Sequence, residues 1–341
     1  MATPSSLPRT ARQVVLSALP AGLPTRADFR VVETPLPAPG PGQVLVRNRA
    51  FLVFAALCSL IGGADDMPLP ALKPGDPLFG PAVGDVLAAP PGSALRPGDL
   101  VRHMAGWRDH ALLPADACTP LGDALPDPVA HLSQGSVAYG ALTRLTGVRP
   151  GDTVFVTGAA GGVGSLAGQI ARLLGAARVI GSTGSPSKAH RLTSELGYDA
   201  VVLRGAEPLA AQLAAAAPDG IDVLVDNVAG DQLTAALGAA RQGARFALVG
   251  TLSGQLSRNR AGGASVEIDA FQVVLRGISL RGYAGADHPD VAAEWPARFG
   301  EWLRSGAIRF PHTAVAGITE APQALQDLIE GRHVGTVVVE P

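Results

Sequence analysis

The segment of this sequence with the clearest chemical meaning is a turn of small residues between an apolar strand pattern and an apolar helix pattern. Residues 154–157 (Val-Phe-Val-Thr) are β-branched and aromatic, which is typical of a buried strand. Ala159, Gly161 and Gly164 follow at the spacing of the dinucleotide-binding fingerprint, with alanine in its first place. Small side chains allow a tight turn and a close approach of the backbone to a pyrophosphate, and the helix that follows supplies N–H donors. We therefore predict a nucleotide site at this turn.

The residues after the second strand predict which nucleotide is bound. An Asp or Glu about 20 residues beyond the glycines would bind the ribose 2′-hydroxyl of NAD, whereas hydroxyls and cations suit the 2′-phosphate of NADP. Residues 181–188 read Gly-Ser-Thr-Gly-Ser-Pro-Ser-Lys, and the next acid is Glu195. Lys188 can supply a point charge and Arg204 a planar guanidinium, although both are also acceptable as solvated surface residues. These residues favour NADP over NAD.

From about residue 125, strand and helix patterns alternate, which indicates βαβ units and a parallel sheet. We predict strands at 153–157, 178–182, 200–203, 223–227, 245–249 and 279–283. Helices are expected at 163–175, 187–196, 206–216, 231–241, 267–276 and 290–305. This part of the chain has the pattern of a Rossmann domain with a doubly wound parallel sheet.

Residues 10 to about 120 have a different pattern, in which short apolar runs alternate with Pro/Gly turns. The runs are 13–16, 29–33, 43–49, 83–88, 99–103 and 110–113, and their spacing predicts a mostly antiparallel β domain. β character returns at 308–310 and 335–339, so the last strands are expected to rejoin the first domain. We therefore expect an α/β protein with a β domain at 1–122 and 306–341 and a Rossmann domain at 123–305.

Composition is that of an ordinary globular protein. The 341 residues are 47% hydrophobic and 16% charged with a net charge of −2, so no basic excess points to nucleic acid or to an anionic membrane. We expect no membrane span and no secretory signal, because no apolar run is long enough and the first residues lack the signal pattern. The two cysteines, Cys58 and Cys118, exclude a disulfide scaffold and favour a reducing, cytoplasmic location.

Several motifs in a fixed order resemble the medium-chain dehydrogenase/reductase superfamily. They include Asp-Phe-Arg at 28–30, Pro-Leu-Pro-Ala-Pro-Gly at 35–40, Gly-Ala-Ala-Gly-Gly-Val-Gly at 158–164, Glu-Leu-Gly-Tyr-Asp at 195–199, Asp-Asn-Val-Ala-Gly at 226–230 and Gly-Arg-His-Val-Gly at 331–335. Within the superfamily, the chain is most similar to the zinc-independent, NADP-dependent 2-alkenal, curcumin and prostaglandin (leukotriene 12-hydroxydehydrogenase) reductases. The resemblance implies a GroES-like β domain, an inserted Rossmann domain and a homodimer joined through Rossmann edge strands.

The fingerprint and the resemblance together place cofactor contacts on the glycine-rich turn, after the later strands and near the C-terminus. The residues are Ala159, Gly161, Gly162, Val163, Gly164, Lys188, Arg204, Asn227, Gly250, Thr251, Leu252, Ser253, Tyr283, Ala284, Gly285 and His333. Lys188 matches the family lysine that pairs with the 2′-phosphate, and Arg204 stands where a family tyrosine also reaches that phosphate. Residues 283–285 are expected beside the nicotinamide carboxamide.

The substrate side departs from the family pattern. Where the family carries Asp-Pro-Tyr-Met-Arg, residues 54–58 read Phe-Ala-Ala-Leu-Cys, and the tyrosine after the family's Gly-x-Ile-Ser segment is Gln255. The family's terminal asparagine is His333, and the lysine after its last glycine is Thr336. The resemblance therefore predicts the cofactor but not the substrate.

The residues also argue against a bound metal. Zinc-dependent relatives need a cysteine on the third β run, a Gly-His-Glu motif and usually a lobe of four cysteines. The place of Gly-His-Glu reads Gly-Pro-Ala-Val-Gly at 80–84, and His103, His110 and His131 lack ligand spacing. Without a metal to polarise it, the acceptor must take hydride readily, as an α,β-unsaturated carbonyl compound or a quinone does.

Hydride transfer to such an acceptor requires hydrogen-bond donors for an enolate oxygen and a proton for the α-carbon. Tyr139, Tyr283 and Gln255 are the candidate catalytic residues, although either tyrosine could serve only as packing, and solvent could protonate an enolate. We predict an NADPH-dependent, metal-independent reductase of activated C=C bonds in small molecules. The alternatives are a quinone oxidoreductase, a stand-alone enoyl reductase of natural-product biosynthesis and a catalytically silent NADPH-binding protein.

Overall fold

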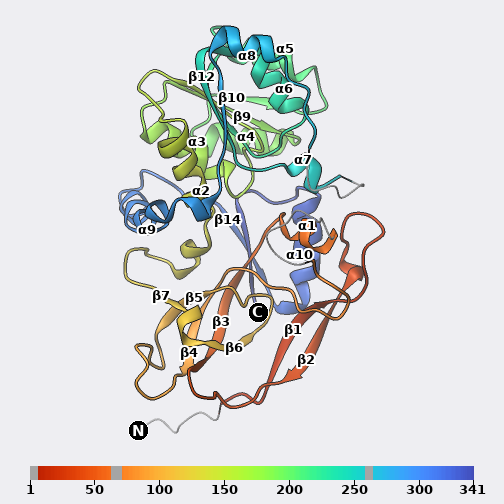
Figure 1. Cartoon of the computed structure of the whole chain (residues 1–341), viewed down its shortest axis with the longest axis vertical. Coiled ribbons are helices and arrows are strands. Elements are labelled where there is room, and N and C mark those ends of the chain that lie inside the picture. The colour runs from red at the N-terminus through yellow and green to blue at the C-terminus, as the bar shows by residue number, and fades with distance from the viewer. Residues whose placement is uncertain (1–6, 63–70, 258–263) are drawn as a thin grey trace. The chain divides into compact units, whose positions relative to one another are not determined.

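The computed structural model describes residues 7–62, 71–257 and 264–341, and these ranges include every residue named above as a cofactor or catalytic candidate. The chain divides into two compact units, each made of separate stretches of sequence (Figure 1). Unit 1 comprises Met1–Leu132, Thr313–Arg332 and Val337–Pro341, and unit 2 comprises Ser133–His312 and His333–Thr336. Each unit is described here by itself.

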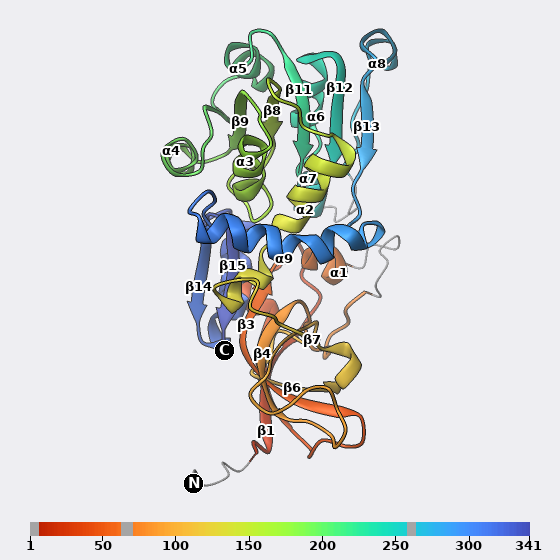
Figure 2. The same cartoon turned by 90° about the vertical axis from the view of Figure 1, so that its left-hand side faces the viewer.

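Unit 2 is built on a six-stranded parallel sheet with the order β10-β9-β8-β11-β12-β13. The strands are β8 (Thr153–Val156), β9 (Arg178–Thr183), β10 (Ala200–Leu203), β11 (Ile221–Asp226), β12 (Ala240–Leu248) and β13 (Ser279–Gly282), and Figure 2 shows most of them side by side. This is the 3-2-1-4-5-6 order of a dinucleotide-binding sheet, in which the direction of winding reverses between the first and fourth strands. The predicted Rossmann sheet is confirmed.

Helices connect these strands and cover both faces of the sheet. They are α3 (Gly164–Leu173), α4 (Pro186–Glu195), α5 (Leu209–Ala216), α6 (Asp231–Gly238) and α8 (Ala270–Arg276). Right-handed crossovers place α3 and α4 on one face and α5, α6 and α8 on the other. Unit 2 also contains α2 (Gly135–Gly140), which continues into one π-helical stretch (Ala141–Leu145), the single turn α7 (Leu252–Gln255) and α9 (Pro289–Arg304).

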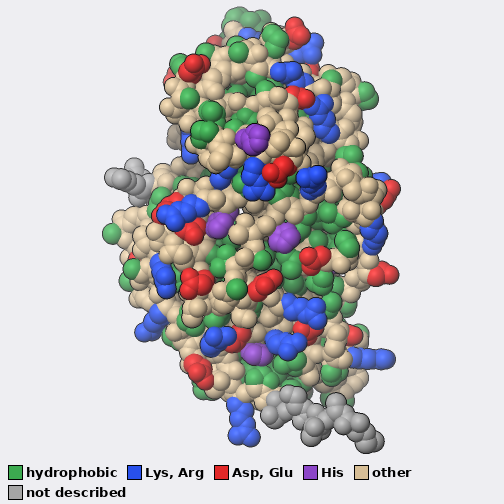
Figure 3. Space-filling view, turned by 180° about the vertical axis from the view of Figure 1, so that it is seen from behind, with side chains coloured by type: hydrophobic (Ala, Val, Ile, Leu, Met, Phe, Trp, Pro, Cys, Tyr) green, Lys and Arg blue, Asp and Glu red, His purple; other side chains and the backbone are tan. Residues whose placement is uncertain are grey.

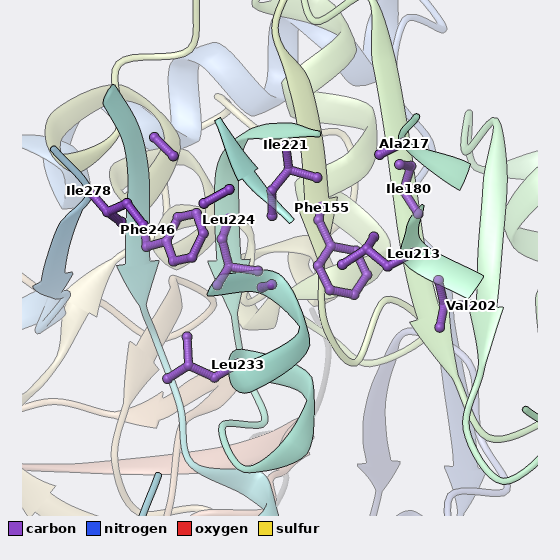
Figure 4. Packing of buried hydrophobic residues seen from close by; sticks show 13 residues of the cluster. Phe155, Ile180, Val202, Leu213, Ala217, Ile221, Leu224, Leu233, Phe246 and Ile278 are labelled. Atoms are coloured by element: carbon purple, nitrogen blue, oxygen red, sulfur yellow. The ribbon is translucent and has the colours of Figure 1, made fainter. Parts of the chain in front are cut away.

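The core of unit 2 lies between the sheet and the α5/α6 layer (Figure 4). Phe155, Leu224 and Phe246 project from neighbouring central strands and are at most 2% exposed. Leu213 of α5 and Leu233 of α6 cover them from the helical side. Both faces of a parallel sheet are buried, which is why its strands read in the sequence as continuous apolar runs rather than alternating ones.

One predicted strand of the C-terminal region is wrong. Residues 308–310 are not in a strand, and β14 (His312–Ala316) begins two residues later. Contacts with side chains, rather than hydrogen bonds to a neighbouring strand, hold this segment in place. The Arg309 N–H donates to Gln169 Oε1 (2.8 Å), and the Phe310 ring packs edge-on against Phe299. Apolar side chains such as Ile308 can therefore be buried without strand pairing, and periodicity cannot distinguish the two cases.

Unit 1 is the antiparallel β domain that the sequence predicts. Its long strand β3 (Gln43–Val53) pairs antiparallel with β4 (Ala82–Ala88), β6 (His110–Pro114) and β15 (Thr336–Glu340). The pairing of Val337–Val339 with Phe51–Val53 returns the end of the chain to the first β strands, as expected. The remaining strands are β1 (Thr10–Leu16), β2 (Phe29–Pro35), β5 (Leu100–His103), β7 (Thr119–Pro120) and β14, and the helices are α1 (Leu57–Gly62) and α10 (Ala321–Ile329).

On the face in Figure 3, Lys and Arg side chains lie interspersed with Asp and Glu. Over the described ranges, no helix combines the length and the apolar composition needed to cross a bilayer.

Candidate cofactor site

The glycine-rich turn is held against the end of β9. Gly158 adopts a left-handed backbone (φ 59°), which favours glycine, and its N–H donates to Ser182 Oγ (3.0 Å). The Ala159 N–H donates to the Ser182 carbonyl (2.9 Å). A side chain on Gly164 would collide with the Gly158 carbonyl oxygen, so glycine allows α3 to start directly on the turn.

The N-terminus of α3 has no side-chain cap. Its N-cap residue is Val163, whose side chain cannot accept a hydrogen bond from the N–H groups of the first turn. The Tyr198 hydroxyl, fully buried, donates to the Gly164 carbonyl (2.6 Å) and fixes this turn from behind. An uncapped helix N-terminus with small residues before it is suited to a negatively charged group such as a pyrophosphate.

Hydroxyls and cations gather where β9 ends. Ser185 begins α4, and its hydroxyl lies 2.9 Å from that of Ser187. Arg204 follows β10, and its Nη2 lies 2.9 Å from the point where a Cβ on Gly184 would stand. In the described part of the chain Arg204 makes no ion pair. The group contains no carboxylate, and therefore fits a ribose 2′-phosphate better than a 2′-hydroxyl.

Lys188 links this group of hydroxyls and cations to residues 333–336. Its ammonium donates to the His333 carbonyl oxygen (2.6 Å), and both residues belong to unit 2. Burial lowers the pKa of the Lys188 amine below its ordinary value. Lys188 and His333 are both predicted cofactor contacts. They are 145 positions apart in the sequence and are in direct contact in the structure.

Residues 333–336 lie along the glycine-rich turn. The Gly335 N–H donates to the Ala160 carbonyl (2.9 Å), and the Thr336 N–H donates to the Pro311 carbonyl (3.0 Å). Gly335 has a φ of 82°, and a side chain there would collide with the Pro311 carbonyl oxygen. Glycine at 335 is therefore needed to bring the segment onto the turn.

A buried carboxylate organises the loop after β11. Asp226 is fully buried and accepts hydrogen bonds from the Thr157 hydroxyl (2.5 Å) and from the N–H groups of Val228 (3.0 Å) and Ala229 (3.0 Å). These bonds hold Ala229 in the left-handed region (φ 63°), which a non-glycine residue rarely adopts. Asn227 is fixed as well, because its Nδ2 donates to the Thr157 carbonyl (2.7 Å).

The loop after β12 is tied to the loop after β11. The N–H groups of Gly250 and Leu252 donate to the carbonyls of Asp226 and Asn227 (both 3.1 Å), and the Ser253 hydroxyl donates to the Val228 carbonyl (2.6 Å). The predicted contacts Asn227 and Gly250–Ser253 are therefore brought together at the carboxyl edge of the sheet. Gln255 closes α7 on the same loop, and within the described residues its side chain makes no hydrogen bond.

The two candidate tyrosines have different environments. Tyr283 follows β13 at the start of the predicted 283–285 contact, and its ring stacks on His288 with centroids 4.9 Å apart. Gly140 leaves the space for its hydroxyl, because a Cβ there would collide with that oxygen. Burial raises the pKa of Tyr283, and no hydrogen bond to its hydroxyl occurs in the described ranges.

Tyr139 is engaged with α9. Its hydroxyl donates to Glu294 Oε1 (2.5 Å), and Glu294 and Asp290 both pair with Arg144 (2.7 and 2.9 Å). Burial raises the pKa of Tyr139, and the bond to Glu294 raises it further. The ring also packs on Trp295. These contacts give Tyr139 a structural task in joining α2 to α9.

Three contributors to the site were not found from the sequence. Ser182 and Tyr198 hold the turn through side chains that are distant in sequence, and no spacing rule identifies them. Gln134 begins α2, and its side-chain amide lies directly against Gly162. For Gln134 the sequence offered one indication, because it is a polar residue directly before the helix that contains the candidate residue Tyr139.

Across the described residues, no three His, Cys, Asp or Glu side chains come together as a possible metal site. Burial raises the pKa of the Cys118 thiol to about 11. A hollow of about 630 Å³ lies between α5 and α6 and includes Arg204 in its wall, but the glycine-rich turn does not line it.

Comparisons with known proteins agree with this geometry. Residues 12–121 match the model of the N-terminal domain of oxidoreductases, and residues 162–303 match the family model described as zinc-binding dehydrogenase. The NADPH-dependent curcumin reductase of Escherichia coli is 30% identical over 339 residues, which are 96% of each chain. The chain belongs to the medium-chain dehydrogenase/reductase superfamily.

Within this superfamily, it belongs to the NADP-dependent alkenal, curcumin and prostaglandin reductase group. The NADP-dependent 2-alkenal reductase of Nicotiana tabacum is 28% identical over 338 residues, which are 96% of each chain. The crystal structure of CurA from Vibrio vulnificus in complex with NADPH superimposes with a TM-score of 0.87 and 28% identity, and covers 96% of this chain and 98% of that one. The predicted superfamily and fold class are confirmed.

Proposed function

We propose that the protein is an NADPH-dependent reductase that transfers hydride to the β-carbon of an activated C=C bond. One observation carries the proposal: beside the glycine-rich turn and the uncapped N-terminus of α3, Lys188, Arg204 and two serine hydroxyls come together without an acidic residue. The chain that carries this group belongs to the alkenal and curcumin reductase group. Bound NADPH supplies the hydride. The class of acceptor is indicated by the relatives, which are a curcumin reductase and a 2-alkenal reductase.

The residues fit NADPH along the carboxyl edge of the sheet. Ala159 and the backbone of Gly161–Gly164 would hold the pyrophosphate, and Lys188 and Arg204 the 2′-phosphate. The loops at Asn227 and Gly250–Ser253, the segment Tyr283–Gly285 and His333 would hold the nicotinamide half. Unit 2 is then the NADPH-binding domain and unit 1 the GroES-like substrate domain, close to the predicted division at 122/123 and 305/306.

Tyr283 and Gln255 are the side chains that we assign to the reacting end. Tyr283 is protonated at neutral pH because the ordinary pKa of a phenol is about 10, and burial raises its pKa further, so its hydroxyl is available to donate to an enolate oxygen. The Gln255 amide carries a second donor on the loop after β12. Tyr139 is already bonded to Glu294, so its contribution is to fix α2, with the proton of the α-carbon supplied by Tyr283 or by solvent.

The choice of acceptor is tested by titrating NADPH fluorescence and then following loss of NADPH absorbance with an enal, an enone, an enoyl thioester and a quinone. Oxidation by the enal or enone supports the proposal. If only the quinone oxidises NADPH, the protein is a quinone oxidoreductase. If only the enoyl thioester does, it is an enoyl reductase of natural-product biosynthesis. Binding with no oxidation would identify a catalytically silent NADPH-binding protein, and no binding would refute the proposal.

We further propose a cytoplasmic homodimer. β13 is the last strand of the sheet, and α8 beside it exposes Phe271 (66%), Val274 (75%) and Leu275 (53%) (Figure 2). A second copy that pairs β13 to β13 would cover these side chains and remove the sheet edge. The buried cysteines Cys58 and Cys118, which form no disulfide, agree with a reducing compartment.

A further inference from the structure

Two polar side chains without hydrogen bonds face the same point of the glycine-rich turn. The Thr336 side chain is buried (1% exposed), and its Oγ1 has no hydrogen-bond partner in the part of the chain that the structure describes. A Cβ on Gly162 would lie 3.4 Å from this oxygen and would collide with Gln134 Oε1. The Gln134 side chain likewise makes no hydrogen bond to a described residue and does not cap α2. Gly162 is therefore covered by one buried hydroxyl without a partner and by one partly exposed amide that makes no hydrogen bond to a described residue.

A buried hydroxyl without a partner is unfavourable in an otherwise complete fold. Such a group loses its hydration and gains nothing in return, whereas a valine of the same shape avoids this loss. Unsatisfied buried polar groups are rare in native proteins, and each one requires an explanation such as a ligand that completes it. The position of Thr336, beside the uncapped N-terminus of α3, indicates a ligand that accepts hydrogen bonds.

The backbone fixes Thr336 in this place. Its own N–H donates to the Pro311 carbonyl, and the preceding Gly335 donates to Ala160 within the turn. Gln134, in contrast, reaches Gly162 through a side chain with three rotatable bonds and no fixed partner. The site thus combines one preorganised donor with one movable arm, and both are uncharged.

We propose that Thr336 and Gln134 are pyrophosphate contacts, with the Thr336 hydroxyl and the Gln134 amide NH₂ donating to phosphate oxygens above Gly162. When a phosphate binds above Gly162, the Gln134 side chain moves away from Gly162. Its amide then donates a hydrogen bond to the phosphate from the side of α2. This inference rests on the proposed NADPH function and adds two contacts that the glycine fingerprint does not contain.

The test compares two ligands that differ in the pyrophosphate. NADPH contains it, whereas adenosine 2′-monophosphate carries the 2′-phosphate and the adenosine without it. Thr336→Val and Gln134→Leu are each expected to weaken NADPH about 10-fold, as for a hydrogen bond to a charged group, and to leave adenosine 2′-monophosphate unchanged. Thr336→Ser keeps the hydroxyl and should bind NADPH within about 2-fold of the wild type, since the phosphate bond is retained.

A matched control removes the same kind of group from unit 1. Ser59 in α1 is buried (3% exposed), and its hydroxyl also has no partner among the described residues. Ser59→Ala should leave both affinities unchanged. Thermal unfolding without ligand checks that each variant is folded, and Thr336→Val is expected to be at least as stable as the wild type. If it unfolds instead, Thr336→Ala removes the hydroxyl with a smaller side chain, and the ³¹P resonance of NADP⁺ pyrophosphate bound to this variant decides: a resonance shifted from that of the wild type supports the contact, and an identical one overturns it.

The outcomes separate this inference from the function beneath it. Wild-type affinity for NADPH in both Thr336→Val and Gln134→Leu would overturn the inference and leave the NADPH function standing. Equal losses for NADPH and adenosine 2′-monophosphate would also overturn it, because they would indicate a merely structural role. A wild-type protein that binds neither ligand would refute the proposed function itself.

Discussion

Replacing Lys188 by alanine should weaken the preference of the cofactor site for NADPH over NADH, with Arg204 supplying the preference that remains. The Lys188 side chain is half-buried, its ammonium is bonded to the His333 carbonyl, and its backbone N–H lies 3.5 Å from Ser185 Oγ. A hydrogen bond from an ammonium to a phosphate contributes about 1.5–3 kcal/mol. From this we subtract about 1 kcal/mol for the bond to His333 that the ammonium gives up.

The difference of about 0.5–2 kcal/mol corresponds to an NADPH affinity roughly 2- to 30-fold lower in Lys188→Ala. The NADH affinity should not change, because NADH has no 2′-phosphate. Removing Arg204 as well should lower the NADPH affinity by a further factor of about 10, provided that the two cations act independently. Fluorescence titration with both nucleotides at one fixed salt concentration measures these ratios.

Arg191 is the matched control for this prediction. It lies on the same helix α4, but it is exposed and pairs with Glu195 one turn away (3.2 Å). Arg191→Ala removes the same charge from α4 and should leave the NADPH-to-NADH ratio unchanged. An equal fall in the NADPH and NADH affinities of Lys188→Ala, or a fall of the same size in Arg191→Ala, would refute the assignment of the 2′-phosphate to Lys188.

Three other outcomes are expected. Val274→Asp on α8 should dissociate the proposed homodimer in analytical ultracentrifugation, whereas Ala210→Asp on the exposed side of α5 should not. His103 is buried between Arg102 and Arg108, and burial lowers its pKa to about 4. Between pH 6.5 and 4 the unfolded chain therefore binds a proton that the folded chain does not, and the free energy of unfolding should fall by about 3 kcal/mol over this range. His103→Asn should remove that part of the pH dependence in urea denaturation. Ala229→Gly should raise the free energy of unfolding by about 1 kcal/mol, because glycine adopts the left-handed conformation without strain; an unchanged or lower value would show that the strain is absent.

The strands and helices of unit 2 could be predicted because their signals are local. The strand at 154–156 is a continuous apolar run, which a strand buried on both faces of a parallel sheet requires. The glycines after it fit the tight turn of the dinucleotide-binding fingerprint. In unit 1 the alternation with Pro/Gly turns gave six strands, whereas α10 was missed. Its buried residues Ala321, Ala324 and Leu325 include two alanines, which carry little periodic signal.

The remainder of the site depends on contacts between distant parts of the sequence. No spacing rule predicts that Ser182 binds the turn, that Asp226 holds Ala229, or that Lys188 reaches His333. Tyr139 illustrates the same limit. Its family position left a catalytic and a packing role open, and only the fold brings Glu294 to its hydroxyl. Long-range partners decide which polar groups are already satisfied and which remain available for a ligand.

Unit 2 is interrupted in the sequence by residues 313–332, and its last piece is His333–Thr336. A ribosome therefore delivers the six strands and the glycine-rich turn well before the segment that lies on that turn. During synthesis the bond from Gly335 to Ala160 can form only after residues 333–336 have emerged, so NADPH meets the complete site only from that point on. A substitution within residues 333–336 then acts on the nucleotide site, although that site begins in the sequence more than 170 residues earlier.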